Sequence, residues 1–254
     1  NRLVELPLGI FTIAIATVYF PAFSECASRG DRNEFGKTFR QSIRLMFAIT
    51  VPATVGFLVM GEPIIAFLFE WGAFRAADTA LTLPLLWTFA LGLPFYSMVV
   101  LLVRGFYAFK DTKAPMKISI FAFVLNLILS LVLMQILGVV GLALANVLAI
   151  LGQTILLAGM LSSRLKLSLV KDLTIDVLKI AISSVVMVLA VLGCRPLVEA
   201  MPLTAKGEVA VLVLIVIPVV VVVYFGTLWL FRFSEMEQLR QLFQRFARRN
   251  SSRD

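Results

Sequence analysis

The whole segment between Lys117 and Arg164 lacks a charged side chain. One helix crosses the hydrocarbon core of a bilayer with about 20 apolar residues, so this segment is long enough for two crossings. Gly138 and Gly141 lie near its middle and predict the tight turn that would join them. A chain with this segment is expected to lie in a membrane.

The composition supports the same conclusion. Hydrophobic residues make up 60% of the chain and charged residues 15%, with a mean hydropathy of +0.98, whereas soluble domains carry about 25% charged residues. The net charge of +8 comes from short basic clusters between apolar runs, which is typical of cytoplasmic loops and not of nucleic-acid binding. There is no histidine, which excludes imidazole catalysis and His-ligated metal. We expect no catalytic residues and no metal site.

Uncharged runs predict seven membrane-spanning helices, because a charge at the bilayer centre costs at least about 2.5 kcal/mol. These runs comprise residues 6–24, 45–61, 79–103, 118–137, 139–163, 180–194 and 209–231. The predicted fold class is therefore all-α, a polytopic membrane helix bundle. The basic loops follow the first, third and fifth spans, so the positive-inside rule places the C-terminus in the cytoplasm and the first residue outside.

Three segments are predicted to lie at the membrane surface. The tail, 233–254, combines a capping box at Ser234 and Glu237 with an apolar stripe opposite arginines, which is typical of a basic amphipathic helix on anionic membrane lipids. Its stripe comprises Met236, Leu239, Leu242, Phe243 and Phe246. A similar apolar face is expected on residues 31–44. Residues 63–74 are too short to span and predict a short outer interfacial helix.

Arg2 and Glu5 are charged residues one helical turn apart at the outer end of the first span. One interpretation is a local ion pair at a helix end. The other is that Arg2 binds an anionic substrate group in a water-filled cavity while Glu5 fixes its direction, because a guanidinium pairs with phosphate oxygens through two parallel hydrogen bonds.

The fourth and fifth spans carry a second set of polar residues. Asn126 and Ser130 are four residues apart on one helix and Asn146 lies on the next, so the three side chains are expected to meet at a similar depth. Gln153 lies further along the same helix as Asn146. Hydrogen bonding between helices is the favoured interpretation. A site for a monovalent cation is the alternative, although no carboxylate is present among these residues.

Prolines within the spans predict bends, because each removes a backbone hydrogen bond. They are Pro7, Pro52, Pro84, Pro94 and Pro218. Bent helices are common in transporters that alternate between inward-open and outward-open states.

Three segments of the chain have a recognisable pattern: RLVELPLGI at 2–10, LFEWGAF at 68–74 and GFYAFKDTKAP at 105–115. In their order and spacing these segments resemble the MurJ/MviN family of lipid II flippases. The third is the most specific, and its residues in the predicted cytoplasmic loop are Gly105, Phe106, Tyr107, Asp111, Thr112, Lys113 and Pro115. The resemblance covers essentially the whole chain, although Trp71 occupies a position where this family frequently has arginine.

The family belongs to the MOP superfamily, whose members arrange two six-helix bundles around a central cavity. The resemblance implies that this chain is the C-terminal part of a longer protein. Residues 1–163 would form the C-terminal transporter lobe, 164–232 an additional helix pair lining a hydrophobic groove for a polyprenyl tail, and 233–254 the tail. Arg2 and Glu5 match positions that face the family's cavity.

The function implied by the resemblance is alternating-access transport of lipid II from the cytoplasmic to the outer face of the bacterial inner membrane. The expected partners are lipid II or a similar polyprenyl-linked precursor, membrane lipids and the N-terminal half of the transporter. No cofactor is expected, although transport would be coupled to the membrane potential or to a monovalent ion.

Four alternatives remain open at the level of sequence. A flippase for another polyprenyl-linked oligosaccharide and a MATE-like exporter would share the bundle. A membrane enzyme acting on polyprenyl phosphates would need clustered carboxylates or histidine, whereas Asp111, Asp172 and Asp176 are scattered along the chain. A non-catalytic structural subunit is the fourth.

Overall fold

The computed structural model describes residues 2–166, 168–169, 173–202, 204–231 and 233. Within this part of the chain seven helical segments are long and apolar enough to cross a membrane, which confirms the predicted count and fold class. The elements are α1 (Arg2–Pro7), the π-helical segment η1 (Leu8–Thr12), α2 (Ile13–Arg29), α3 (Arg32–Phe69), α4 (Ala76–Ala108), α5 (Lys113–Leu137), α6 (Val139–Leu165), α7 (Thr174–Glu199), α8 (Ala205–Val211), the π-helical segment η2 (Leu212–Val216) and α9 (Ile217–Leu230).

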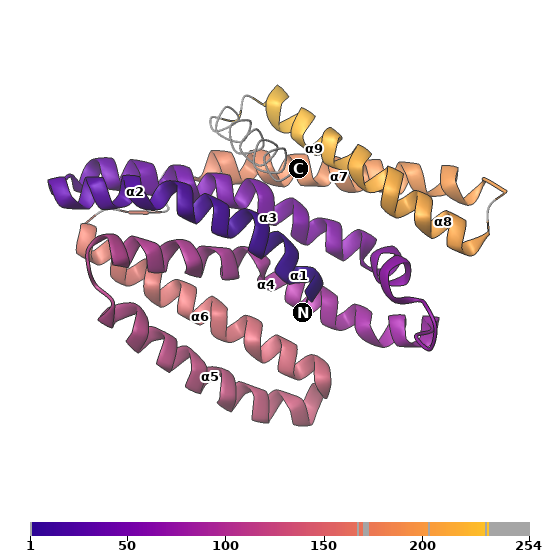
Figure 1. The fold of residues 1–254 in the computed structure, drawn as a ribbon, viewed down its shortest axis with the longest axis horizontal. Helices are drawn as coiled ribbons and strands as arrows, with labels where there is room; N and C mark the ends of the chain where they lie inside the picture. Colours follow the sequence, from indigo (N-terminus) through magenta and orange to yellow (C-terminus); the bar gives the residue numbers. More distant parts are fainter. Residues whose placement is uncertain (1, 167, 170–172, 203, 232, 234–254) are drawn as a thin grey trace, which may run out of the picture.

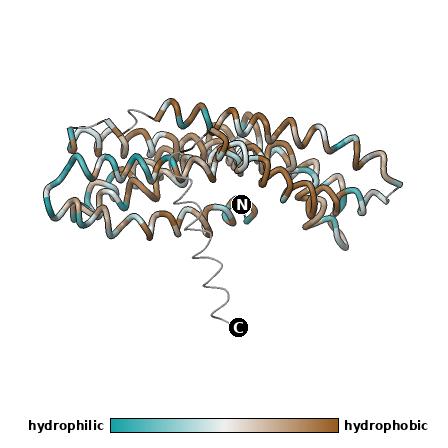
Figure 2. Tube along the Cα trace, turned by 90° about the horizontal axis from the view of Figure 1, so that it is seen from above, coloured by the Kyte–Doolittle hydropathy of each residue, from teal (hydrophilic) through white to brown (hydrophobic). Residues whose placement is uncertain are grey.

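Helices α3 and α4 form the centre of the bundle. The first segment, α1 to α2, packs on both of them, and α6 packs on α4 with α5 as its hairpin partner. The last pair lies on the opposite side, with α7 against α3 and α9 against α7 (Figure 1). Figure 2 shows hydrophobic residues along the middles of the helices and hydrophilic ones towards their ends, as expected for a bundle that crosses a membrane.

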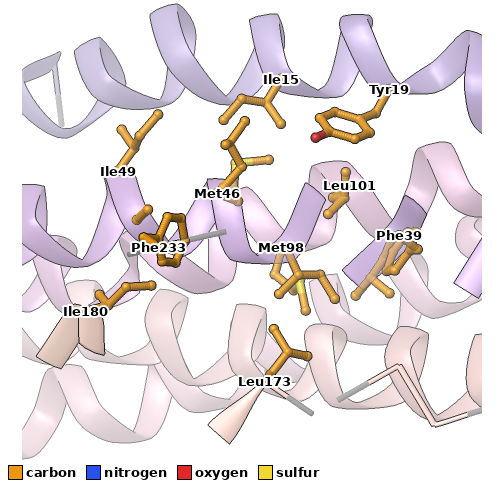
Figure 3. Packing of buried hydrophobic residues seen from close by; sticks show 14 of the residues in the cluster. Ile15, Tyr19, Phe39, Met46, Ile49, Met98, Leu101, Leu173, Ile180 and Phe233 are labelled. Atoms are coloured by element: carbon orange, nitrogen blue, oxygen red, sulfur yellow. The ribbon is translucent and has the colours of Figure 1, made fainter. Parts of the chain in front are cut away.

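A single large core joins the central helices to the last pair. Phe23 of α2 and Phe39 of α3 are fully buried, with ring centroids 5.3 Å apart. Met98 of α4, Leu173 before α7 and Ile180 of α7 belong to the same cluster (Figure 3). The last pair is therefore packed into the core of the bundle.

The prediction of a separate outer helix at residues 63–74 is wrong. Helix α3 continues through Pro63 and ends at Phe69, and a turn follows before α4 begins. A proline inside a helix removes one hydrogen bond and crowds the preceding turn, but membrane-spanning helices tolerate it where neighbouring groups satisfy the freed backbone. At 1.5 Å per residue, the 38 residues of α3 extend about 57 Å, well beyond the hydrocarbon core of about 30 Å.

The prediction that residues 31–44 lie on the membrane surface is also wrong. These residues form the cap and first turns of α3, and Phe35, Phe39 and Ile43 are completely buried. Phe35 packs against Phe23 of α2 and Phe109 after α4, with ring centroids 5.4 and 4.8 Å apart. The apolar face is therefore covered by protein. The predicted amphipathic tail lies outside the described residues except for Phe233, which is buried.

Two of the five predicted proline sites lie beside irregular backbone. Pro7 is followed directly by η1, and η2 ends two residues before Pro218. Such π-helical turns rearrange the hydrogen bonds that a proline disrupts. Pro52, Pro84 and Pro94 lie within continuous helices.

One end of the bundle collects the basic loops and is called the basic end below. It contains residues 30–31, 109–112 and 166. Here the Nε atom of Arg44 lies 2.8 Å from the Oδ2 atom of Asp176, and the Nζ atom of Lys179 lies 3.8 Å from Oδ1. Asp176 is nearly buried, at 8% side-chain exposure, in the first turn of α7, where the helix dipole favours a carboxylate. This contact fixes the start of α7 to α3.

The hairpin between α5 and α6 turns on glycine, as predicted. Gly138 ends α5 with a φ angle of 60°, which side chains with a Cβ atom rarely adopt. Gly141 lies against α5, where a Cβ atom would overlap the carbonyl oxygen of Leu133. The two helices therefore approach each other more closely than any larger residue at position 141 permits.

Replacing Gly141 with alanine is expected to destabilise the hairpin. The added methyl group meets rigid backbone, so the free energy of unfolding should fall by about 1–3 kcal/mol, the usual cost of overpacking. Unfolding in detergent, followed by circular dichroism, measures this change. Gly159→Ala is the matched control, because nothing lies within 4 Å of the added atom. Equal effects of the two substitutions would contradict the close-approach explanation.

Candidate functional site

Arg2 lies beside a cavity at the start of α1. The cavity has a volume of about 220 Å³ and is lined by Arg2, Leu3, Val4, Phe69, Thr82, Leu85, Leu86 and Phe89. Its walls come from α1 and from the adjoining ends of α3 and α4. A guanidinium at such a site offers a fixed positive charge and several N–H donors to an anionic group.

Glu5 is placed differently from the prediction. It is exposed and does not line the Arg2 cavity. Within the described part of the chain, neither Arg2 nor Glu5 takes part in an ion pair. The local ion pair considered from the sequence is therefore not formed in this structure.

The three polar residues of the fourth and fifth spans do come together. The Ser130 hydroxyl donates to Oδ1 of Asn126 at 3.2 Å. Both line a second cavity, of about 250 Å³, together with Asn146, Leu85, Phe89, Val139, Leu142 and Ala143. Leu85 and Phe89 also line the Arg2 cavity, so the two cavities share part of their walls.

Two hydrogen bonds between helices involve polar residues of the fifth span, but neither of them joins Asn146 to Asn126 or Ser130. The Tyr96 hydroxyl on α4 donates to Oδ1 of Asn146 on α6. Gln153 bonds elsewhere, donating to the Ser119 hydroxyl on α5 at 3.0 Å. Sequence reasoning missed Tyr96, although its hydroxyl in the middle of an uncharged span was the signal that could have identified it.

The loop motif at 105–115, at the basic end, forms a clasp, by which we mean the contacts of Asp111 that connect α4, α5 and α6. Oδ1 of Asp111 accepts hydrogen bonds from the backbone N–H groups of Lys113 and Ala114, both at 3.0 Å. Oδ2 pairs with the guanidinium of Arg164 at the end of α6, which also lies 5.6 Å from the ring centroid of Phe106. The pKa of Asp111 lies below its usual value because these groups stabilise the carboxylate. The Ala114 N–H group contributes most, and the charge of Arg164 contributes less.

The other motif residues support this clasp. Gly105 is buried in α4, where a Cβ atom would lie 3.1 Å from side chains of Leu161 and Phe39. Lys110 adopts a left-handed conformation, with φ 58°. Pro115 is buried in the first turn of α5, whereas Tyr107, Thr112 and Lys113 are exposed. The motif therefore acts here as a structural junction. Arg164 was the partner that sequence reasoning did not assign to it.

An apolar groove lies between α3 and the last helix pair. Its volume is about 320 Å³, and its walls come from α1, η1, α3, α7 and α9. Pro52, Met60, Val191, Val220 and Tyr224 are among the lining residues. The groove lies where the resemblance places a hydrophobic groove along the additional pair.

Asp111→Asn should remove stability that depends on pH. Because the folded-state pKa is lowered, the carboxylate stabilises the folded protein above its unfolded pKa of about 3.9, and this contribution disappears as the pH falls through the folded pKa. The wild type should therefore unfold at a higher temperature than the variant at pH 7, with the difference shrinking below about pH 4.

Thermal unfolding in detergent across this pH range checks the prediction. Glu25→Gln is the control, because Glu25 pairs with Arg29 in an exposed position and such pairs contribute little. A wild-type advantage over Asp111→Asn that persists unchanged at pH 3 would refute the role assigned to the carboxylate.

Comparisons with known proteins agree with this arrangement. A family model described as "Lipid II flippase MurJ" matches residues 1–206. A protein of Bdellovibrio bacteriovorus named "Probable lipid II flippase MurJ" is 29% identical over 95% of this chain and 46% of its own length. A protein of Thermotoga maritima with the same name is 32% identical over 94% of the chain and 46% of its own length.

A solved structure, "Lipid II flippase MurJ, inward closed conformation", matches with a TM-score of 0.72 and 28% identity, covering 91% of this chain and 45% of the solved one. The chain thus spans somewhat less than half the length of these relatives. Since the family model covers most of the sequence and the helical architecture agrees, the chain belongs to the MurJ family of lipid II flippases.

Proposed function

We propose that this chain forms the C-terminal half of a flippase that carries lipid II from the cytoplasmic to the outer face of the bacterial inner membrane. The observation that carries the proposal is the position of Arg2, the one charged residue among the described residues that line its cavity. Family membership and the apolar groove beside the last helix pair support it further.

The head of the substrate requires a polar path. A charged diphosphate with attached sugars and peptide cannot enter hydrocarbon unaided, because an unpaired charge buried there is very costly. Arg2 would bind the diphosphate through its guanidinium, and the neighbouring cavity with Asn126, Ser130 and Asn146 offers further polar contacts. Glu5, exposed on the same helix, would restrict the directions open to Arg2. In a complete transporter, the N-terminal half would supply the opposite wall.

The tail of the substrate requires an apolar path. The groove between α3 and the last helix pair is lined almost wholly by aliphatic and aromatic side chains, which suits a polyprenyl chain. Head and tail would therefore be bound by different parts of the same chain. The two halves of the transporter would then tilt about the bound head to open the cavity to either face. No covalent bond changes in this process, so the protein would act as a carrier and not as an enzyme.

The membrane potential is a suitable energy source. Moving negative charge outward across a membrane that is negative inside is favourable by about 2.3 kcal/mol per charge per 100 mV. A monovalent cation that binds beside the anionic head is the second possible source of coupling. The basic loops favour an orientation with the basic end and the C-terminus in the cytoplasm.

Arg2→Ala in the complete protein tests the proposal. Loss of the charge should leave the diphosphate unpaired, so the variant should fail to rescue a bacterium depleted of its own flippase. Membrane abundance, measured by immunoblotting, should stay within about twofold of the wild type, since Arg2 is exposed and exposed substitutions cost about 0.5 kcal/mol or less.

Two matched variants sharpen this test. Arg2→Lys retains the positive charge but lacks the planar guanidinium, so it should rescue growth partially. Glu25 is exposed and far from the cavity in sequence, so Glu25→Gln should rescue growth fully. Full rescue by Arg2→Ala would remove Arg2 from the substrate site. A failed rescue by every variant together with low abundance would indicate a structural role.

A further inference from the structure

Two prolines in the centre of the bundle leave backbone carbonyl groups without their usual helical donors. In an α-helix the N–H group of each residue donates to the carbonyl four residues earlier, and proline has no N–H group. Pro52 of α3 therefore withholds a bond from Ala48, and Pro94 of α4 withholds one from Ala90. Both alanines are completely buried, so water cannot replace the missing donors.

Hydroxyl groups from neighbouring helices supply both bonds. The Tyr224 hydroxyl of α9 donates to the Ala48 carbonyl at 2.9 Å. The Thr54 hydroxyl of α3 lies 2.9 Å from the Ala90 carbonyl and also 3.0 Å from that of Thr50. A hydroxyl group of one helix thus bonds to a proline-freed carbonyl of another in two places. One place is between α9 and α3, and the other is between α3 and α4.

Tyr224 is also part of the apolar groove. Its ring lines the groove together with Pro52 and Ile49, while its hydroxyl bonds to Ala48 and the whole residue is only 1% exposed. Helix α9 packs mainly on α7, so this hydrogen bond links α9 directly to α3 across one side of the groove.

We propose that Tyr224 is a positioning residue: by bonding to the carbonyl that Pro52 leaves free, it fixes α9 against α3 at the separation that admits a polyprenyl chain. This inference rests on the proposed lipid transport. Without the hydroxyl, the Ala48 carbonyl has no donor in hydrocarbon and α9 loses its fixed distance from α3. The groove then becomes wider or collapses, and its affinity for an extended apolar chain falls.

A double-mutant cycle tests the proposal in the full-length transporter in lipid nanodiscs. The variants are Tyr224→Phe, Pro52→Ala and the double substitution, and the probe is a polyprenyl monophosphate whose binding is titrated. Tyr224→Phe should weaken binding about tenfold when Pro52 is retained. The free energy of one buried hydrogen bond is lost from the arrangement that binds the chain, so the fraction of protein in that arrangement falls. In the Pro52→Ala background the effect should be less than about twofold, because the restored N–H group bonds to Ala48.

Pro94→Ala provides the matched control background. It restores a helical donor for Ala90 and not for Ala48, so Tyr224→Phe should keep its tenfold effect there. The midpoint of thermal unfolding gives a second cycle that does not depend on ligand, and it should show the same coupling between positions 224 and 52. Ratios are compared within each background, so any effect of the proline substitution that does not depend on position 224 cancels.

The outcomes separate this inference from the proposed function. Equal effects of Tyr224→Phe with and without the Pro52→Ala substitution, in binding and in unfolding, would overturn the positioning role while leaving lipid transport intact. A wild-type protein that fails to bind the polyprenyl phosphate at all would overturn the proposed transport, and the positioning role with it.

Discussion

Hydrocarbon supplies no hydrogen-bond partners, so every backbone group within the bundle must be satisfied by the protein itself. Unbroken helices satisfy most of them, and the prolines create the exceptions. At Pro7 and Pro218 the neighbouring backbone adopts π-helical turns, whereas at Pro52 and Pro94 a hydroxyl from another helix donates to the free carbonyl. Pro52 and Pro94 are therefore accommodated together with contacts between helices.

The same constraint explains where charged side chains occur. Paired charges gather at the basic end, where Asp111 joins the starts and ends of three helices and Asp176 attaches the last pair to α3. In the hydrocarbon region the helices are joined by amides and hydroxyls, such as Gln153 with Ser119. Arg2, near the opposite end, lines a cavity. It is thus available to a ligand, whereas Arg164 already has its partner.

Uncharged runs predicted the seven spans and the glycine hairpin because the cost of a buried charge is a local property of the sequence. The continuation of α3 beyond Pro63 was not predictable in the same way, since a proline marks both helix ends and bends. The burial of Phe35, Phe39 and Ile43 depended on what covers them. An apolar helix face has the same sequence pattern whether it packs on lipid or on protein. The meeting of Asn126, Ser130 and Asn146 followed from the hairpin, but Tyr96 came from a third helix whose rotation the sequence does not specify.

Leu85 and Phe89 line both the Arg2 cavity and the amide-lined cavity, so the two spaces are about one side chain apart. A ligand that displaces Leu85 or Phe89 when it enters one cavity therefore changes the shape of the other cavity as well. By thermodynamic reciprocity, occupation of either cavity would then alter the affinity of the other to the same degree.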